Sequence, residues 1–168
     1  MLLKNIIYSL TCLSFSVVIG AAIYEHIAVV PQWSAGPPLS LSMFQGKYGL
    51  NPTPFWKSIH PVTMILLLIS IVLFWSTERR TCMLITSAGY VVVLIITFAY
   101  FVPQLVTITG SAYSEHIDEV LTRKAALWEK LSLVRLSFLI MLAITLFMGL
   151  TIASSNIRVP KNLPEYTN

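Results

Sequence analysis

Four apolar stretches, each long enough to cross a lipid bilayer, constrain this 168-residue chain more than any other feature. A membrane-spanning helix needs about 20 predominantly apolar residues. We predict spans over residues 5–30, 55–75, 82–102 and 131–153. Backbone groups in lipid must find their hydrogen-bond partners within the protein, so these spans are expected to be helices. The sequence therefore predicts an all-α fold, a four-helix transmembrane bundle that forms a single domain over residues 1–168.

The composition agrees with an integral, multi-pass membrane protein whose main partner is the lipid bilayer. Charged residues make up 11% of the chain, against about 25% in an ordinary soluble domain. The 11 basic residues are scattered and form no continuous stripe, so the net charge of +4 does not indicate nucleic-acid binding. Cys12 and Cys82 both lie in apolar runs and show no zinc-ligand spacing.

An even number of spans places both termini on one side of the membrane and the two long loops, 32–54 and 104–130, on the other. Basic residues divide evenly between the two faces. The Arg79-Arg80 turn and the acids Glu115, Asp118 and Glu119 in the second long loop favour cytoplasmic termini. A cleaved signal peptide ending near residues 20–22 is the alternative reading of the first span, and the long apolar run disfavours it.

Two short patterns predict how the helices end and pack. Val-Pro-Gln occurs at residues 30–32 and 102–104, and since proline cannot continue a helix we expect the first and third spans to end there. A Glu-His pair lies near each copy, which suggests two related helix pairs. Small residues spaced four apart, Ser16 with Gly20 and Thr145 with Gly149, predict close approach between helices.

The ionisable residues of the apolar spans converge on the loop side of the bundle. His26, His60 and His116 all fall on that side, whichever way the chain is oriented. Glu25 adjoins His26, and Arg135 enters the fourth span from the same side. Ionisable groups at membrane depth are costly and normally face a partner inside the protein. Glu25 and Arg135, at comparable depth on different helices, are the predicted pair.

Three hypotheses account for this convergence. In the first, a buried Glu25–Arg135 pair fixes the helix register of a non-catalytic scaffold or partner subunit. In the second, His26, His60 and His116 bind copper, zinc or iron with Glu25 or Glu115 as a further ligand, although no helical ligand spacing marks such a site. In the third, the catalytic residues are His26 or His60 as the base, Arg135 as the stabiliser of the resulting anion, and Glu25 as an orienting group.

Aromatic residues gather on the loop side as well. The candidates for lining a substrate pocket there are Tyr24, Trp33, Asn51, Trp56 and Trp128. Tryptophan and tyrosine are also enriched at membrane interfaces in general, so part of this set is expected to form an interfacial belt. Trp128, Ser132 and Arg135 fall on one face of a helix and are expected to face the same space.

A few motifs resemble the DUF1772 family, four-helix integral membrane proteins that include the fungal anthrone oxygenases. The matching segments are Val29-Val30-Pro31, Asn51-Pro52-x-x-Phe55, Val102-Pro103, and Trp128 followed by Val134-Arg135. The resemblance implies oxygenation of an acidic C–H group in an aromatic ketone, without a classical cofactor. The leading expectation is a small membrane oxygenase or related redox enzyme acting on a lipophilic, aromatic or quinone-like small molecule. The sequence leaves open whether a single transition metal is bound and whether the chain forms a homo-oligomer.

Overall fold

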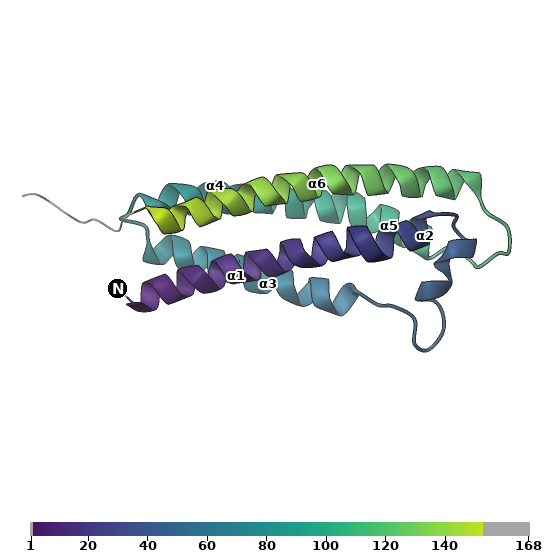
Figure 1. The fold of residues 1–168 in the computed structure, drawn as a ribbon, viewed down its shortest axis with the longest axis horizontal. Helices are drawn as coiled ribbons and strands as arrows, with labels where there is room; N and C mark the ends of the chain where they lie inside the picture. Colours follow the sequence, from purple (N-terminus) through teal and green to yellow (C-terminus); the bar gives the residue numbers. More distant parts are fainter. Residues whose placement is uncertain (1, 153–168) are drawn as a thin grey trace, which may run out of the picture.

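The computed structural model is an elongated bundle of helices, described here for residues 2–152 (Figure 1). Four continuous helical segments are long and apolar enough to cross a membrane, which confirms the predicted fold class. The helical elements are α1 (Leu2–Tyr24), η1 (Glu25–Val29), α2 (Val30–Ser34), η2 (Leu39–Phe44), α3 (Thr53–Leu73), α4 (Arg79–Ile96), η3 (Thr97–Phe101), α5 (Val102–Thr109) and α6 (Glu119–Thr151).

The expectation that Pro31 and Pro103 end their helices is wrong. The first segment runs on to Ser34 and the third to Thr109. In both, a π-helical turn, η1 or η3, lies directly before Val-Pro-Gln, and the valine N–H bonds to the carbonyl five residues back instead of four. The wider turn shifts the register of the helix just where proline lacks its N–H, so the chain continues without breaking.

The fourth segment begins at Glu119, well before the predicted apolar start at residue 131, and continues unbroken to Thr151. Asp118 caps it, since its Oδ1 accepts from the N–H groups of Val120 and Leu121 at 2.7 and 3.1 Å. A helix of 33 residues is about 50 Å long, whereas the hydrocarbon core is about 30 Å thick. The first turns of α6 therefore extend beyond the core. The predicted end at residue 153 lies outside the described residues.

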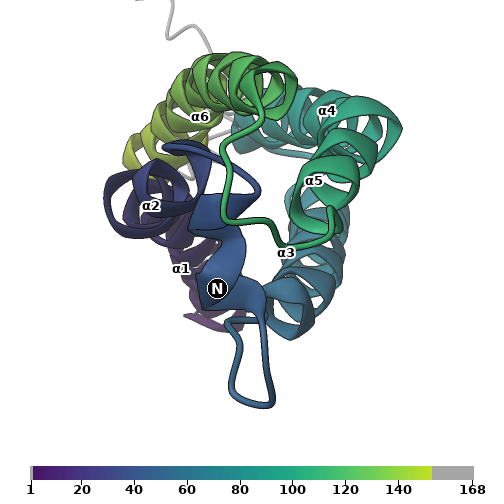
Figure 2. The same ribbon diagram turned by 90° about the vertical axis from the view of Figure 1, so that its right-hand side faces the viewer.

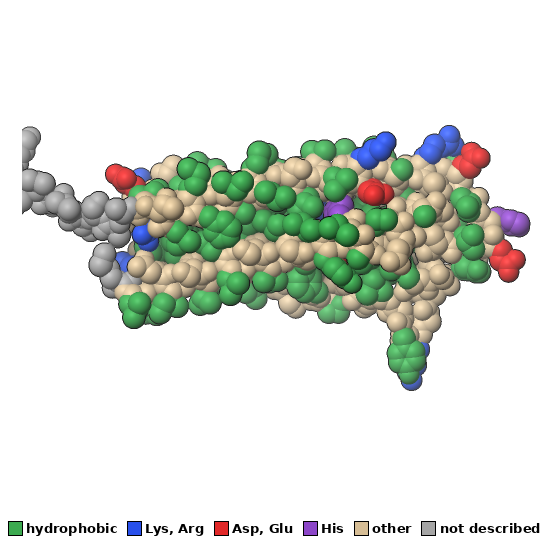
Figure 3. Space-filling view, viewed as in Figure 1, with side chains coloured by type: hydrophobic (Ala, Val, Ile, Leu, Met, Phe, Trp, Pro, Cys, Tyr) green, Lys and Arg blue, Asp and Glu red, His purple; other side chains and the backbone are tan. Residues whose placement is uncertain are grey.

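The helices alternate in direction, so Leu2 and Thr151 lie at one end of the bundle and the long loops at the other (Figures 1 and 2). Helix α1 packs on α3 and α6, and α4 packs on α6 and α3. On the face drawn in Figure 3, charged side chains lie toward the two ends and hydrophobic ones cover the length between them. This distribution is typical of a bundle surrounded by lipid.

Hydroxyl pairs connect α1 and α3 inside the bundle. The Oγ atoms of Thr11 and Ser70 are 2.7 Å apart, and those of Ser14 and Thr63 are 2.6 Å apart. All four residues are buried. Hydrogen bonds of this kind hold transmembrane helices together where the hydrophobic effect gives no preference between lipid and protein.

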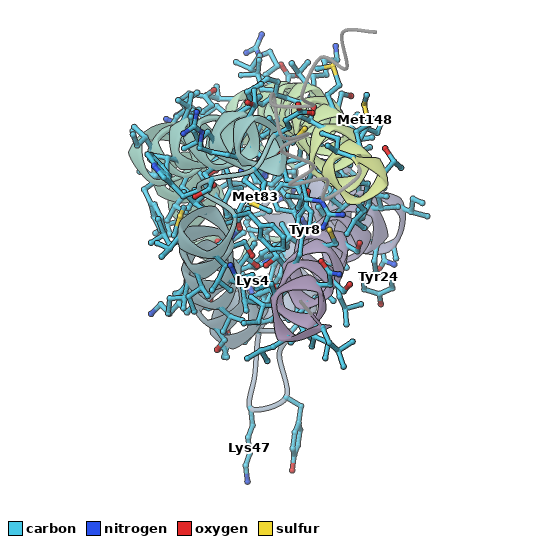
Figure 4. The ribbon with its side chains drawn as sticks, turned by 90° about the vertical axis from the view of Figure 1, so that its left-hand side faces the viewer. Lys4, Tyr8, Tyr24, Lys47, Met83 and Met148 are labelled. Atoms are coloured by element: carbon cyan, nitrogen blue, oxygen red, sulfur yellow. The ribbon has the colours of Figure 1, made fainter. Side chains whose placement is uncertain are left out.

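The two predicted small-residue pairs differ in their role. A Cβ on Gly149 would collide with the hydroxyl of Tyr8, which donates to the carbonyl of Leu146 at 2.6 Å, so this glycine permits close α1–α6 packing. Gly20 faces outward with no neighbour within 4 Å of such an atom, so the prediction for Ser16 and Gly20 is wrong within this chain. Figure 4 shows Tyr8 and Met83 in the interior at the terminal end.

Arg79 closes the terminal end of the bundle. Its side chain is buried, and it donates to the carbonyl of Ile152 and to Oδ1 of Asn5, both at 3.0 Å. The guanidinium carbon also lies 5.4 Å from the centre of the Phe74 ring. The adjacent Arg80 is exposed. The two arginines of this turn therefore have different roles, which the sequence alone did not separate.

Candidate functional site

Glu25 is the first residue of the π-helical turn η1, and its carboxylate faces α3. The indole Nε1–H of Trp56 donates to Glu25 Oε1 at 2.8 Å. Both side chains are partly buried. A tryptophan N–H is a neutral donor, so the hydrogen bond supports the carboxylate without cancelling its charge.

Arg135 lies on α6 and reaches toward the π turn η3. It donates to Thr97 Oγ1 at 3.1 Å and to Ser132 Oγ at 2.8 Å, and its guanidinium carbon lies 4.1 Å from the centre of the Phe101 ring. Thr97 opens the π turn η3 as Glu25 opens η1, and each stands five residues before the valine of Val-Pro-Gln. The short repeat thus places two polar side chains at equivalent positions.

The expected Glu25–Arg135 ion pair is not formed directly. Across the described chain, the polar partners of these side chains are Trp56 for the carboxylate and two hydroxyls for the guanidinium. The reason is local: Ser132 and Thr97 lie nearer the guanidinium than any carboxylate, and Trp56 lies nearer Glu25.

His60 lies one helical turn beyond Trp56 on α3, between the rings of Trp56 and Tyr90. Its Nδ1 is 2.7 Å from the hydroxyl of the fully buried Tyr90, and its ring is stacked on Trp56 with centroids 5.2 Å apart and planes at 23°. Trp56 therefore contacts both Glu25 and His60. Together, Glu25, Trp56, His60, Tyr90, Thr97, Ser132 and Arg135 form what we call the polar layer.

His26, in the π turn beside Glu25, has one nitrogen without a partner. Its Nδ1 lies 2.8 Å from the carbonyl oxygen of Ala22. Since a carbonyl only accepts, Nδ1 must carry the proton, and the neutral ring then has a lone pair on Nε2. That Nε2 is buried, and residues 2–152 provide no hydrogen-bond partner for it. A buried nitrogen of this kind is uncommon and calls for a functional explanation.

The candidate pocket residues fall into three groups. Trp56 belongs to the polar layer. Trp33 and Trp128 are buried in a hydrophobic cluster, 5.4 Å apart between ring centres, and Trp128 Nε1 donates to the carbonyl of Phe101 at 2.9 Å. Tyr24 is 65% exposed and points away from the bundle (Figure 4), and Asn51 accepts from the N–H of Thr53 at the start of α3.

These placements correct part of the predicted pocket. Tyr24 and Asn51 do not line a common pocket, because Tyr24 faces outward and Asn51 is exposed in the loop before α3, where it accepts from the N–H of Thr53. Trp33 fills the core. The predicted shared face of Trp128, Ser132 and Arg135 is confirmed, because Ser132 binds Arg135 and Phe101 contacts both Trp128 and Arg135.

The four predicted metal ligands do not come together. His116 and Glu115 are exposed in the loop before α6, whereas His26 and His60 lie within the helical segments. Within residues 2–152, no three His, Cys, Asp or Glu side chains are arranged to hold a metal ion. The second Glu-His pair is therefore no structural counterpart of Glu25-His26.

The sequence interpretation missed Tyr90, Thr97 and the buried role of Arg79. Thr97 carried a usable signal, because it has the same spacing to Val-Pro-Gln as Glu25. Tyr90 carried none, since a single tyrosine in an apolar helix is not distinguished from an ordinary core aromatic. Its pairing with His60 depends on the packing of α4 against α3.

Comparison with known proteins adds no relative to this geometry. No protein-family model matches the chain, no curated protein is significantly similar to it in sequence, and no solved structure is significantly similar in fold.

Proposed function

We propose that the protein is a small membrane enzyme that performs acid–base chemistry on a lipophilic molecule at the loop end of the bundle. The observation that carries this proposal is the buried, unpartnered Nε2 of His26. A neutral imidazole with a free lone pair can accept a proton and so act as a general base. It adjoins Glu25, whose carboxylate accepts from the indole N–H of Trp56 at 2.8 Å.

In this proposal each group has a distinct role. His26 takes a proton from an acidic C–H or O–H group of the substrate, and Arg135 stabilises the oxyanion or enolate that results. Glu25, held by Trp56, stabilises the imidazolium form of His26. His60, whose Nδ1 is bound to Tyr90, is the alternative base.

The finer proposal is an oxygenase or related oxidoreductase, and it rests on the resemblance to the DUF1772 family. There the substrate is an aromatic ketone or quinone-like molecule, and dioxygen is the oxidant of the carbanion. A methylene group plus dioxygen gives a carbonyl group plus water, so the reaction balances without a further reductant. A metal cofactor and a homo-oligomer remain predictions that elemental analysis and sizing in detergent test.

Turnover of anthrone-like and quinol-like substrates by the purified protein tests this proposal. We expect His26→Gln and Arg135→Gln each to lower the rate at least about 100-fold, the usual contribution of a general base or an oxyanion donor. His116→Gln is the matched control, since this histidine is exposed in a loop at the same end. Unchanged turnover in both site variants would exclude the proposed roles.

A second candidate function is a non-catalytic membrane scaffold or partner subunit. The observation that favours it is that Glu25, His60 and Arg135 each have a hydrogen-bond partner of neutral type within the protein. In this case the polar layer only fixes helix register. His26→Gln would then change stability and partner binding, with no catalysed reaction to lose.

The proposed orientation places the termini in the cytoplasm. Lys4, Arg79 and Arg80 lie at the terminal end of the described chain, and the acids Glu115, Asp118 and Glu119 lie at the other. Because basic residues divide evenly between the two faces, this orientation rests on the Arg79-Arg80 turn at one end and on these acids at the other. A cysteine introduced at exposed Tyr48, in the loop end, would react with an impermeant thiol reagent added from outside.

A further inference from the structure

A hollow of about 390 Å³ lies at the turn between α3 and α4, at the end of the bundle opposite the polar layer (Figure 1). It is lined by Trp75, Ser76, Thr77, Glu78, Arg80 and Thr81. The N–H of Thr77 donates to the carbonyl of Phe74 at 3.0 Å, and that of Arg80 donates to the carbonyl of Thr77 at 3.2 Å. These backbone hydrogen bonds give the turn, and with it the hollow, a fixed shape.

The hollow carries one charge of each sign. Glu78 and Arg80 both line it, and both side chains are exposed. Residues two apart at the start of a helix do not face each other, and within residues 2–152 no ion pair joins these two. The Glu78 side chain also makes no capping hydrogen bond to α4. The hollow therefore presents a carboxylate and a guanidinium separately, instead of a neutralised pair.

Arg80 is positioned by an aromatic ring. Its guanidinium carbon lies 5.0 Å from the centre of the Trp75 ring, whereas the neighbouring Arg79 spends its donors on Asn5 and Ile152. A guanidinium that contacts a ring with its face keeps the N–H groups at its edge available. The hydroxyls of Ser76 and Thr81 line the same hollow. Donors of these kinds suit the oxygens of a phosphate group.

The hollow lies where the lipid-facing surface of the bundle ends. Val72, one turn before Trp75 on α3, is 74% exposed, and Ile85 on α4 is 52% exposed. Trp75 is itself 54% exposed, and a tryptophan at the end of a span is typical of the headgroup level. A phosphate from the bilayer therefore reaches this hollow while its acyl chains stay on the apolar surface.

The second charge of the headgroup follows from Glu78. An exposed carboxylate accepts N–H hydrogen bonds, which a primary ammonium donates and a trimethylated one does not. A quaternary ammonium prefers an aromatic face, and Arg80 already contacts that of Trp75. The charges of the hollow are thus complementary to a phosphate that is linked to a primary amine.

We propose that this hollow binds the headgroup of an ethanolamine phospholipid, with the phosphate on Arg80 and the ammonium on Glu78. The acyl chains lie on the apolar surface that begins at Val72. The inference goes beyond the proposed function, because the polar layer lies at the other end of the bundle and takes no part in this site.

Native mass spectrometry of the purified protein tests the site, with dioleoyl phosphatidylethanolamine, phosphatidylcholine and phosphatidylglycerol added at equal concentration. We expect the ethanolamine lipid to bind at least about threefold more tightly than the other two, the size of an exposed ion-pair contribution. Soluble phosphoethanolamine should not displace it at the same concentration. Equal binding of the three lipids would overturn the proposal, and so would displacement by the soluble ester, because the occupant would then not be a lipid.

Two variants assign the charges. Arg80→Met should lower binding of the ethanolamine and glycerol lipids alike at least about threefold, because it removes the phosphate ligand. Glu78→Gln should abolish the preference for ethanolamine over choline and leave binding of the glycerol lipid undiminished. Lys57→Met is the matched control, since Lys57 is an exposed cation near the opposite end of α3. Equal lipid binding by Arg80→Met and Lys57→Met would overturn the proposal, as would a retained ethanolamine preference in Glu78→Gln.

Discussion

The indole of Trp56 on α3 and the carboxylate of Glu25 in the π turn η1 are joined by a hydrogen bond of 2.8 Å, and the same indole is stacked on His60. Trp56 thus connects an acidic group at the end of the first helix with a histidine one turn along its own helix. It keeps Glu25 directed into the bundle without an ion pair.

Loss of this hydrogen bond should destabilise the protein. Trp56→Phe keeps an aromatic ring beside His60 but leaves Glu25 without its donor, so we expect the free energy of unfolding to fall by about 1.5–3 kcal/mol. Trp75→Phe is the control, because Trp75 is 54% exposed at the opposite end. Equilibrium unfolding in bicelles measures both, and equal losses would contradict the assignment.

The separation of Glu25 and Arg135 predicts weak coupling between them. In a double-mutant cycle with Glu25→Gln and Arg135→Met, the coupling energy should stay below about 1 kcal/mol, whereas breaking a direct buried pair costs about 3–5 kcal/mol. The cycle of Thr97→Val with Arg135→Met should give the larger value. Extensive recovery of stability in the Glu25→Gln/Arg135→Met double variant would instead support the structural-pair hypothesis.

Adjacent arginines should respond differently to the same substitution. Arg79→Met removes two hydrogen bonds from a buried guanidinium, so we expect a loss of about 2–3 kcal/mol. Arg80 is exposed and lies 5.0 Å from the Trp75 ring, so Arg80→Met should cost less than about 1 kcal/mol. Thermal denaturation in detergent compares them, and similar melting temperatures would contradict the role of Arg79.

Two glycines provide a packing test. Gly149→Ala forces a Cβ against the Tyr8 hydroxyl and should destabilise by about 1–3 kcal/mol. Gly20→Ala meets no neighbour and should be neutral or slightly stabilising. Tyr8→Phe removes the colliding oxygen, so its combination with Gly149→Ala should cost less than the sum of the two single changes. Additive losses would show that the contact is not shared.

The tautomer of His26 can be observed directly. Because Nδ1 donates to the carbonyl of Ala22, ¹⁵N NMR of the neutral imidazole should show a proton on Nδ1 and a bare Nε2. A ring protonated on Nε2 alone would remove the free lone pair on which the proposed base depends. His116, exposed in the loop, provides a reference spectrum from the same sample.

The hydrophobicity of the spans and their even number together made much of this architecture predictable. Runs of about 20 apolar residues have few solutions in lipid other than helices, and an even number of them forces the termini to one end. His26, His60 and Arg135 were placed at the loop end by counting alone. The helix ends were less predictable, because a π turn lets Val-Pro-Gln continue a helix that proline would otherwise stop.

By itself the sequence determined the number of spans, their helical form and the end of the bundle at which the ionisable residues gather, because these follow from transfer free energies and chain direction. Only the tertiary structure decided which groups meet. Arg135 faces Thr97 and Phe101 rather than Glu25, Trp56 joins Glu25 to His60, and His116 stands apart from the other histidines. Such partnerships depend on helix rotation, and a single π turn changes that rotation by the angle of one residue.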